Sequence, residues 1–577
     1  MNPQPKTTSP AAPAVPRKDA NEWWRCAVIY QIYPRSFNDG NGDGMGDLPG
    51  VIERLDYLKR LGIDAIWFSP FFKSPQVDAG YDVSDYFDID PLFGTLDDFK
   101  KLLAGIHSRG MKCIIDMVPN HCSDQHPSFQ EALAAGPKSP ERERFIFRYN
   151  PDGVPNNWRS EFGGSAWEPV QPHSGLPEDA GWWYLHLFAP EQPDWNWQNP
   201  EVDKLFLDYL RFWSDLGVDG FRVDVAHGLV KAAGFPDDPV DEEVWEKRLR
   251  NGQETPVSGP MWDQDGVHEI YRRWRHFLDE HYGRDRMMVA ESWVPTLHRQ
   301  ALYVREDEMS QAFNFEYLLS HWGSPRQRHI IEESLAENSA VGAPTTWVLS
   351  NHDQMRHASK YGYDEPLPNL SMGIGIDDPQ PDVALGRKRA RAASLFMLGL
   401  PGSAYLYQGE ELGLGDHTTL DDTLRQDPTW KRTGHQVRGR DGCRIPLPWN
   451  STATSLGFST SPRTWLPFPP EYRELAVDLQ ESDADSTLNL YREALVARRE
   501  RALGTAECIE WLDTEPGLLA FRSGNTVVAV NTSHGDHPLP AMGTIVVASN
   551  PQVGRTGAAW NQDKLLPADG AVWLEVH

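Results

Sequence analysis

The stretch GFRVDVAH, residues 220–227, has the pattern of a buried β-strand that nevertheless carries two charged side chains. Side chains alternate across a strand, so the apolar residues at 221, 223 and 225 are expected on one face. Arg222 and Asp224 are then expected together on the opposite face. Burying charged groups costs free energy unless they pair with each other or serve a ligand. The stretch therefore marks a functional position on a core strand.

Seven other short apolar runs resemble this one, and most are followed by an amphipathic helical segment. The eight runs are VIYQIY (28–33), AIWFSP (65–70), KCIIDMV (112–118), GFRVDV (220–225), MMVAES (287–292), QAFNFEY (311–317), TTWVLS (345–350) and GSAYLY (402–407). The helical segments place apolar residues at three- and four-residue spacing. Alternating strands and helices predict a parallel sheet of the α/β class. Eight such strands predict a (β/α)8 TIM barrel.

Two intervals in this pattern are too long to be simple connections. The first, residues 119–199 after the third strand, is rich in Trp, Pro, Gly and Asn and predicts an inserted loop-rich subdomain. The second, residues 409–482 after the eighth strand, is similarly irregular. The chain end alternates like antiparallel hairpins and predicts a small C-terminal antiparallel β-domain. The expected organisation is a disordered N-terminal extension (1–22), barrel (23–120), insert (121–199), barrel (200–503) and C-terminal β-domain (504–577).

The composition excludes several classes of partner. Lysine and arginine total 55 against 83 acidic residues, and the formal charge of −28 disfavours nucleic acid and anionic membranes. The 22 tryptophans favour flat ligands such as sugar rings. Five scattered cysteines without metal spacing, no signal peptide and no apolar span predict a cytoplasmic protein. The oligomeric state stays open.

Polar residues gather where the predicted strands end. They are Asp116, Asn120 and His121 on the third strand, Arg222 and Asp224 on the fourth, Glu291 on the fifth, and Asn351, His352 and Asp353 on the seventh. Barrel enzymes carry their catalytic groups at the carboxyl ends of the strands. The sequence therefore predicts one cluster of acids, histidines and an arginine at this end of the barrel.

These segments resemble the conserved regions of the α-amylase superfamily, glycoside hydrolase family 13. The matching segments are DMVPNH (116–121), QPDWN (192–196), GFRVDVAH (220–227), VAESW (289–293), SNHD (350–353) and GSAYLYQGEE (402–411). By this resemblance the insert is domain B and the tail is domain C. Three further segments resemble the α-glucosidase and oligo-1,6-glucosidase branch: GYDVSDY (80–86), NNWRSEFGGSAW (156–167) and GRDGCRIPLPW (439–449).

The resemblance implies a retaining mechanism, which needs two carboxylates about 5–5.5 Å apart. Asp224 is implied as the nucleophile and Glu291 as the acid/base, with Asp353 binding sugar hydroxyls. Arg222 is expected to lower the pKa of Asp224 by its opposite charge. The pKa of Glu291 is expected to be raised by burial and by neighbouring anions, so that it holds a proton. Asp116 is expected to orient this network.

The same resemblance implies a set of substrate-binding residues. They are Tyr81, Asp82, Tyr86, His121, Arg222, His352 and Arg440. Asp82 and Arg440 match the pair that holds the terminal glucose, which would close one end of the cleft and make the enzyme exo-acting. Either Tyr81 or Tyr86 is expected to support the sugar ring.

A second motif, DGNGDGMGDL (39–48), alternates oxygen donors with glycines. Asp39, Asn41, Asp43, Asp47 and the Met45 carbonyl are spaced like the front half of an EF-hand loop, although position twelve is not glutamate. Similar loops in the branch bind Ca²⁺, or Mg²⁺, away from the catalytic pocket. The loop is therefore predicted to hold a structural Ca²⁺, with Mg²⁺ or a simple glycine-rich turn as the alternatives.

The resulting functional hypothesis is a retaining, exo-acting α-glucosidase that acts on short oligosaccharides, with α-1,4 linkages of the maltose type favoured. An oligo-1,6-glucosidase is one alternative, because valine at position 225 accompanies α-1,6 preference in parts of the branch. A transglucosylase or sucrose-acting enzyme would use the same groups with another acceptor. A non-catalytic sugar-binding scaffold is disfavoured, since Asp224, Glu291 and Asp353 are all present.

Overall fold

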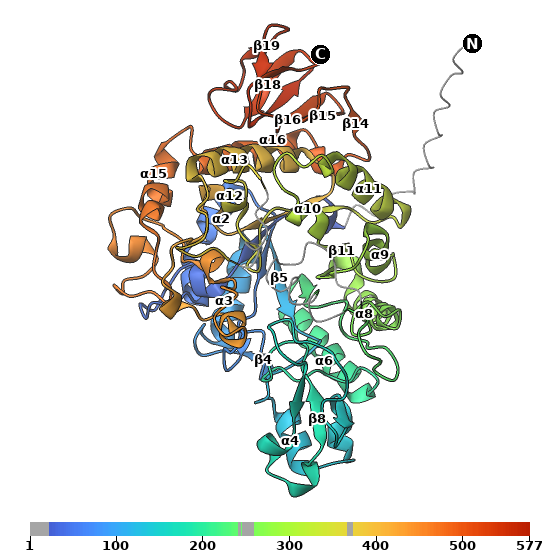
Figure 1. The fold of residues 1–577 in the computed structure, drawn as a ribbon. Helices are drawn as coiled ribbons and strands as arrows, with labels where there is room; N and C mark the ends of the chain where they lie inside the picture. Colours follow the sequence, from blue (N-terminus) through green and yellow to red (C-terminus); the bar gives the residue numbers. More distant parts are fainter. Residues whose placement is uncertain (1–21, 241–243, 245–258, 366–372, 577) are drawn as a thin grey trace, which may run out of the picture.

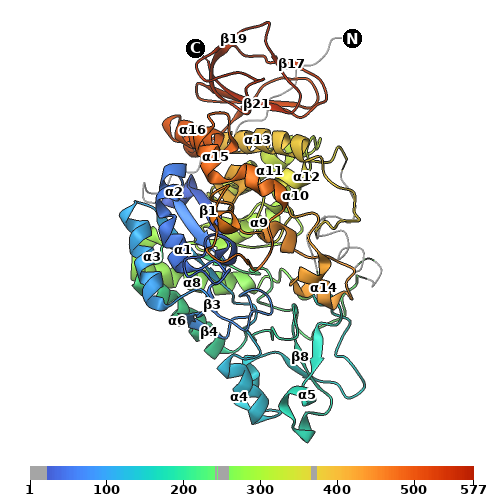
Figure 2. The same ribbon diagram turned by 90° about the vertical axis from the view of Figure 1, so that its left-hand side faces the viewer.

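The computed structural model describes residues 22–240, 244, 259–365 and 373–576. Figures 1 and 2 show a central barrel, an insert at one end of the molecule and a C-terminal sheet at the other. The predicted N-terminal extension lies outside the described residues, except for residue 22. No described helix combines the length and the apolar character that a bilayer crossing requires.

The barrel is an eight-stranded parallel sheet in the order β11-β10-β9-β5-β2-β1-β13-β12. Its strands are β1 (Val28–Ile32), β2 (Ala65–Phe68), β5 (Lys112–Met117), β9 (Gly220–Val223), β10 (Met287–Ala290), β11 (Gln311–Ala312), β12 (Thr346–Val348) and β13 (Ser403–Tyr407). Each lies within one of the eight predicted runs. The (β/α)8 prediction is confirmed.

The barrel is nearly closed, with β11 and β12 at the two ends of the strand order. The Thr346 hydroxyl donates to the Ala312 carbonyl across the gap between them. β11 is short because the Asn314 side chain accepts a hydrogen bond from the Tyr317 N–H, 3.0 Å away, and caps the next helix. The prediction of a strand through residue 317 was therefore wrong beyond Ala312.

Helices cover the outside of the barrel and follow its strands. They are α1 (Leu48–Glu53), α2 (Leu55–Leu61), α3 (Leu96–Ser108), α6 (Pro200–Leu216), α8 (Val267–Tyr282), α9 (Leu297–Ala301), α10 (Phe315–Leu319), α11 (Gln327–Ala340), α12 (His357–Lys360), α13 (Val383–Gly399), α14 (Pro428–Arg432), α15 (Val477–Ser482) and α16 (Thr487–Glu500). α6 shows the local signals that define such a helix. The Asn199 side chain caps its start, Pro200 is the first residue, and Gly217 ends it at φ +109°.

The interior of the barrel is packed with side chains rather than open. Alternate residues of the strands, including Trp67, Ile114 and Tyr405, form one buried cluster inside the barrel. Phe221 and Val223 belong to the cluster beneath the helices, as alternation predicts. Val225 does not share their face, because the strand ends at Val223 and Val225 turns to φ +46° against the insert. The predicted position of Val225 was wrong for that reason.

The insert between β5 and α6 contains a small three-stranded sheet in the order β6-β8-β7. Its elements are α4 (Pro127–Ala135), β6 (Phe147–Tyr149), β7 (Trp167–Pro169), α5 (Gln171–Ser174) and β8 (Trp182–Leu185). A short hairpin, β3 (Phe72–Lys73) and β4 (Asp85–Ile89), leaves the barrel nearby. Two isolated bridges, His121 with Asp194 and Phe145 with Trp195, close the base of the insert.

The C-terminal part is an antiparallel sheet, as predicted. Six of its strands follow the order β14-β15-β16-β21-β18-β19, and β17 pairs with β20. The strands are β14 (Glu510–Trp511), β15 (Leu518–Ser523), β16 (Thr526–Asn531), β17 (His537–Pro538), β18 (Gly543–Ala548), β19 (Ala559–Trp560), β20 (Leu565–Leu566) and β21 (Gly570–Glu575). The sheet packs on α13, where the Trp573 indole donates to the Leu395 carbonyl at 3.0 Å. The boundary residues of the domains remain predictions.

Candidate active site

The two carboxylates implied as catalytic lie side by side at the carboxyl end of the barrel. β9 and β10 are neighbours, with Val223 opposite Ala290. The Asp224 N–H donates to the Met117 carbonyl at 2.9 Å, and the Glu291 N–H donates to the Val223 carbonyl at 3.0 Å. These main-chain bonds extend the sheet by one residue and hold Asp224 and Glu291 on adjacent strand ends.

Arg222 binds three carboxylates at once. Its Nη1 lies 2.6 Å from Asp224 Oδ1 and 3.2 Å from Asp116 Oδ2, while its Nη2 lies 2.8 Å from Glu291 Oε2. The arginine is 2% exposed. One buried guanidinium therefore fixes the spacing of Asp224 and Glu291, which explains why this strand carries charge on its inner face.

Several acids compete for protons around this arginine. Burial raises the pKa of Asp224 well above its usual range, Arg222 lowers it, and the charges of Glu291 and Asp116 raise it further. Arg222 lowers the pKa of Asp224 as expected, but burial and the two neighbouring acids outweigh it, so the pKa lies above the usual range. Burial likewise raises the pKa of Asp116 to about 7. Burial and like charge therefore favour the protonated form of Asp224 compared with an exposed aspartate.

Asp353 has the opposite environment. Its Oδ1 accepts from Arg440 at 3.0 Å and from Arg444 at 2.9 Å, and its Oδ2 lies 3.2 Å from His352 Nε2. Burial alone would raise the pKa of Asp353, but His352, Arg440 and Arg444 together lower it below the usual range. Asp353 is therefore ionised, and its pKa shift is opposite to that of Asp224.

Tyr81 and His352 line the same space. The Tyr81 hydroxyl lies 2.8 Å from Asp116 Oδ2 and 2.6 Å from His352 Nε2. Their rings are stacked, with centroids 5.4 Å apart and an angle of 9° between the planes. Burial lowers the pKa of His352 well below its usual range, so the ring is neutral. The Gln31 amide nitrogen holds its other ring nitrogen at 2.7 Å.

Tyr86, the alternative to Tyr81, does not lie with the other site residues. Its hydroxyl donates to the Val118 and His121 carbonyls, at 3.0 and 2.8 Å. Its ring packs against Phe206 and Tyr209 of α6. Tyr86 supports the strand end from behind, and only Tyr81 is placed to meet a sugar.

The partner of Arg440 is Asp78 rather than Asp82. Arg440 Nη2 lies 2.8 Å from Asp78 Oδ1, and its Nε lies 2.6 Å from Asp427 Oδ2. Both Asp82 oxygens are occupied by the main chain, accepting from the Val77 and Asp78 N–H groups at 2.8 and 3.0 Å. The Asp82 prediction was wrong because this side chain shapes the turn that presents Asp78.

His121 lies at the edge of the same site. Its Nδ1 is 3.1 Å from the Asn120 amide nitrogen and its Nε2 is 3.1 Å from the Gln192 amide nitrogen. Gln192 also donates to Asp78 Oδ2 at 3.3 Å. Burial and the charge of Lys231 lower the pKa of His121 to about 3, so the ring is neutral.

Four site residues were missed by the sequence reasoning: Asp78, Gln192, Arg444 and Phe162. Gln192 and Phe162 lie inside insert segments already recognised as motifs, and Arg444 lies inside GRDGCRIPLPW. Phe162 packs under the Arg440 guanidinium, 5.2 Å from ring centroid to Cζ. The motifs located these residues, but only the fold shows that they point into the site.

The predicted metal loop is held by its own side chains. Asp39 accepts from the Gly42 and Gly44 N–H groups at 2.6 and 2.7 Å, and its Oδ2 also accepts from the Ser459 hydroxyl. Asn41 and Asp43 accept from N–H groups two residues ahead, and Asp47 caps α1. In the described part of the chain, no three His, Cys, Asp or Glu side chains are arranged to hold a metal. Calcium binding stays a prediction.

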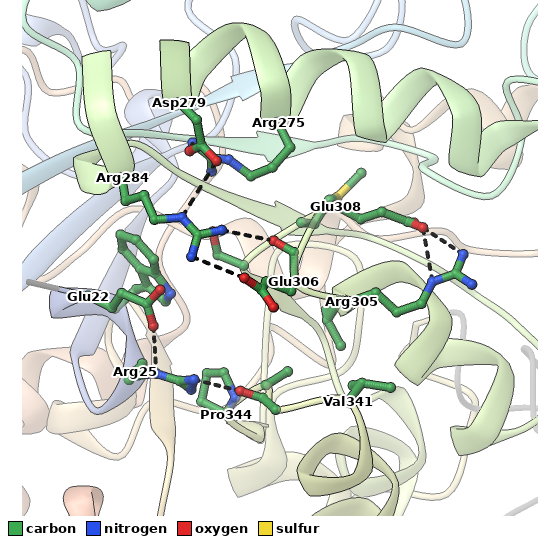
Figure 3. A pocket seen from close by; sticks show the side chains of 16 residues that line it. Glu22, Arg25, Arg275, Asp279, Arg284, Arg305, Glu306, Glu308, Val341 and Pro344 are labelled. Carbon is green, nitrogen blue, oxygen red and sulfur yellow. Dashed lines mark hydrogen bonds and ion pairs between the residues drawn. The ribbon is translucent and has the colours of Figure 1, made fainter. Parts of the chain in front are cut away.

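A cavity of about 100 Å³ lies at the opposite, amino end of the strands (Figure 3). Four arginines line it, and each faces a carboxylate: Arg25 with Glu22 (2.7 Å), Arg275 with Asp279 (2.6 Å), Arg284 with Glu306 (3.6 Å) and Arg305 with Glu308 (2.6 Å). Because the charges are paired within the cavity wall, this region stabilises the barrel floor rather than forming part of the site.

The barrel, with clustered carboxylates at the carboxyl ends of its strands, defines a glycoside hydrolase. The chain belongs to the α-amylase family, because residues 31–506 match the family model described as "Alpha amylase, catalytic domain".

Relatives within the family include glucosidases and a glucosyl transfer enzyme. A probable alpha-glucosidase of Rhizobium meliloti is 38% identical over 519 residues, covering 87% of each chain. The oligo-1,6-glucosidase of Parageobacillus thermoglucosidasius is 34% identical, covering 89% of this chain and 91% of its own. The crystal structure of an alpha-glucosyl transfer enzyme, XgtA, is 34% identical with a TM-score of 0.80, covering 96% of this chain and 99% of its own.

Proposed function

We propose that this glycoside hydrolase is a retaining, exo-acting α-glucosidase that removes terminal glucose from short oligosaccharides. The observation that carries the proposal is the placement of Asp224 and Glu291 on one guanidinium, at 2.6 and 2.8 Å. Two carboxylates held by one guanidinium favour the short separation of a retaining enzyme over the wider separation that an inverting enzyme needs.

In the first step, ionised Asp224 attacks C1 of the terminal glucose. The bond from C1 to the leaving oxygen breaks as Glu291 gives that oxygen its proton, and a β-glucosyl ester forms on Asp224. The step requires the proton on Glu291 and the negative charge on Asp224. Arg222 stabilises the negative charge of Asp224 through its 2.6 Å contact.

In the second step, the roles of the acid reverse. Glu291, now ionised, takes a proton from a water molecule, and that water attacks C1 from the face that the leaving group vacated. The ester bond to Asp224 breaks and α-glucose leaves. Positive charge develops at the ring in both steps, and the ionised Asp353 is placed to stabilise it.

The exo character follows from the groups around Arg440. Its guanidinium joins Asp78 from the loop after β2, Asp353 after β12 and Asp427 from the segment after β13. Gln192 of the insert reaches Asp78 from the other side. These contacts join the barrel and the insert across one end of the cleft, so a chain end fits and a continuing chain does not.

For the linkage we propose α-1,4 glucosides of the maltose type. Support comes from Ala226, His227 and Gly228, which depart from the oligo-1,6-glucosidase pattern; the probable alpha-glucosidase relative supports α-glucosidase activity as such. An α-1,6 preference is the second candidate, supported by the oligo-1,6-glucosidase relative and by Val225 beside the nucleophile. Glucosyl transfer, the activity for which the XgtA relative is named, would use the same ester intermediate.

The test is a set of initial rates on maltose, isomaltose, sucrose and trehalose with all products identified. Fastest release of glucose from maltose would support the full proposal. Fastest release of glucose from isomaltose would assign an α-1,6 instead of an α-1,4 preference. Formation of new disaccharides from sucrose would assign glucosyl transfer instead of hydrolysis. No turnover of any of the four would overturn the proposed function.

We also propose that the loop of residues 39–47 takes a structural Ca²⁺. Support comes from its donor set: three aspartates, the Asn41 amide and the Met45 carbonyl are hard oxygen ligands of the kind Ca²⁺ prefers. An ion there would join β1 to the segment that contains Ser459, which already contacts Asp39. It would act on stability and stay outside the catalytic steps.

A further inference from the structure

Both oxygens of the Glu291 carboxylate are held by nitrogen donors. The Val225 main-chain N–H donates to Oε2 at 3.0 Å, and Arg222 Nη2 lies 2.8 Å from the same oxygen. The Trp293 indole N–H donates to the other oxygen, Oε1, at 3.3 Å. Peptide, guanidinium and indole nitrogens donate and do not accept, so the direction of these contacts depends on no choice of amide orientation or imidazole tautomer.

The Trp293 ring is itself held in place by the segment that follows β11. It stacks on Phe315, with ring centroids 3.6 Å apart and an angle of 15° between the planes. Phe315 is the first residue of α10, is 4% exposed, and belongs to the buried cluster inside the barrel, against which Trp293 packs. Because the Asn314 cap ends β11 early, α10 begins where Phe315 can contact the indole, and the indole then lies beside Glu291.

An indole donor at Oε1 acts differently on the two protonation states of Glu291. The proposed mechanism needs Glu291 protonated when the leaving oxygen departs and ionised when water attacks. A hydrogen bond to a carboxylate is charge-assisted and stronger than one to the neutral acid. At 3.3 Å the bond from Trp293 is longer than an ordinary N–H···O bond, so it can tighten as the proton leaves. The indole therefore stabilises the charge that develops on Glu291 more than it stabilises the resting acid.

We propose that Trp293 is a positioning residue of the acid/base, which orients Glu291 through Oε1 and assists the transfer of its proton to the leaving group. This inference rests on the proposed function, in which Glu291 protonates the leaving oxygen. Arg222 contacts Asp224 and Glu291 alike, whereas the indole donates to the acid/base. Loss of the indole N–H should therefore slow a substrate in proportion to how much its leaving group needs a proton.

Trp293→Phe offers the test, because it keeps an aromatic ring on Phe315 and removes the N–H. A sugar leaves as an alcohol and needs a proton from Glu291, whereas fluoride leaves as a stable anion with little need of one. The two substrates are the disaccharide that the wild type cleaves fastest and α-D-glucosyl fluoride. We expect W293F to lower kcat/KM about tenfold for the disaccharide and by less than about threefold for the fluoride.

The pH profile gives a second readout, which a loss of packing alone would not move. A donor to a carboxylate favours its ionised form, and Glu291 acts in the first step while it is protonated. Removing the donor should therefore move the basic limb of kcat/KM for the disaccharide upward by about 0.5–1 pH unit. The acid limb, which reports the ionisation of Asp224, should stay in place. An unmoved basic limb in W293F would overturn the proposal.

Trp347→Phe is the matched control, because the buried Trp347 indole on β12 donates to the Pro401 carbonyl at 2.6 Å instead of to a catalytic acid. W347F should lower thermal stability and change kcat/KM for both substrates by the same factor. Equal losses of W293F on the two substrates, wild-type kcat/KM of W293F on the disaccharide, or the same selective loss in W347F would overturn the proposal. If W293F does not fold, Phe315→Leu tests the same link, since it keeps the N–H and loosens the indole. A loss confined to the disaccharide would then support the proposal, and equal losses or none would overturn it.

A readout independent of turnover separates this inference from the proposed function. In protein labelled with ¹⁵N-tryptophan, the Trp293 indole N–H proton signal, assigned by its loss in W293F, should move upfield in Glu291→Ala because its acceptor is lost. It should stay in place in Asp353→Asn, which changes a different carboxylate of the site. An unmoved signal in E291A, or equal movement in both variants, would overturn the inference even if glucosidase activity is found. Movement confined to E291A would uphold the contact even if none of the four sugars is cleaved, so that the proposed function alone had failed.

Discussion

Replacing Arg222 tests how its positive charge affects the two catalytic carboxylates, Asp224 and Glu291. Arg222→Met removes the charge, and Arg222→Lys keeps a charge that cannot span two carboxylates as a planar fork does. In the wild type, Nη1 and Nη2 reach Asp224 and Glu291 at 2.6 and 2.8 Å. Both variants leave the two acids unsubstituted, and a shift of the pH profile, unlike a loss of rate, reports the charge of the guanidinium rather than its role in spacing the acids.

The magnitude follows from the opposing effects on Asp224. Burial raises the pKa of Asp224 and Arg222 lowers it. An adjacent opposite charge typically lowers a carboxyl pKa by about 1–3 units. Without Arg222 the pKa rises further, and the ionised fraction at a pH below it falls by about 10- to 1000-fold. The acid limb of kcat/KM should therefore move upward by about 1–3 pH units in R222M and by less in R222K.

The pH dependence of the free energy of unfolding tests the same electrostatic argument without measuring turnover. Burial raises the folded-state pKa values of Asp224 and Asp116 above their unfolded values, and loss of Arg222 raises them further, so the folded variant prefers these two carboxyls protonated. The contribution of these carboxyls to the free energy of unfolding is then fully present at low pH and is lost as the pH rises through their folded-state pKa values. The unfolding temperature of R222M should therefore fall further and further below that of the wild type as the pH rises. An unmoved acid limb, or a stability difference that does not grow with pH, would refute the reasoning.

Three further predictions follow from the contacts. Asp78→Asn should raise KM for short glucosides by about tenfold or more, because a charge-assisted contact is lost. Asp82→Asn should mainly lower thermal stability, and equal kinetic effects of the two variants would contradict the pairing of Asp78 with Arg440. Tyr81→Phe should reduce kcat/KM while Tyr86→Phe should not, as measured with the best substrate; the reverse order would place the wrong tyrosine in the site. Chelation should lower the unfolding temperature if the loop 39–47 holds Ca²⁺, and added Ca²⁺ should restore it; unchanged melting would exclude an ion.

The fold was predictable because each barrel strand is short, apolar and followed by a helix with clear end signals. The exceptions have local causes. Asn314 caps a helix where the apolar run continues, so a strand was extended too far. Val225 takes a positive φ directly after the nucleophile, which alternation cannot foresee. A β-branched residue there is strained by about 1–3 kcal/mol, and such strain is concentrated at functional sites.

The site was predictable to the level of motifs and less so to the level of single side chains. The motif GYDVSDY contains Asp82, which shapes a turn. Asp78, which binds Arg440, lies two residues before the start of the motif. Only the hydrogen bonds of Asp82 to the main chain show that its oxygens are taken. Gln192 and Arg444 could not be predicted for the same reason, because residue spacing does not reveal which way a loop side chain points.

Electrostatic expectations from sequence failed where burial dominates. An arginine two residues from an aspartate suggested a lowered pKa, yet the strand places both in the barrel interior with two more acids. Desolvation and like charge then outweigh the ion pair at Asp224. At Asp353 two arginines outweigh burial, and the carboxylate stays ionised. The same residue types thus take different protonation states according to how many cations reach them.

The most direct measurement is to trap the glucosyl ester with 5-fluoro-α-D-glucosyl fluoride and to locate it by peptide mass spectrometry. Our account predicts one added fluoroglucosyl group per chain on the peptide that contains Asp224, formed with burst release of fluoride. An adduct on another residue, or turnover of the reagent to an inverted product without any adduct, would contradict it.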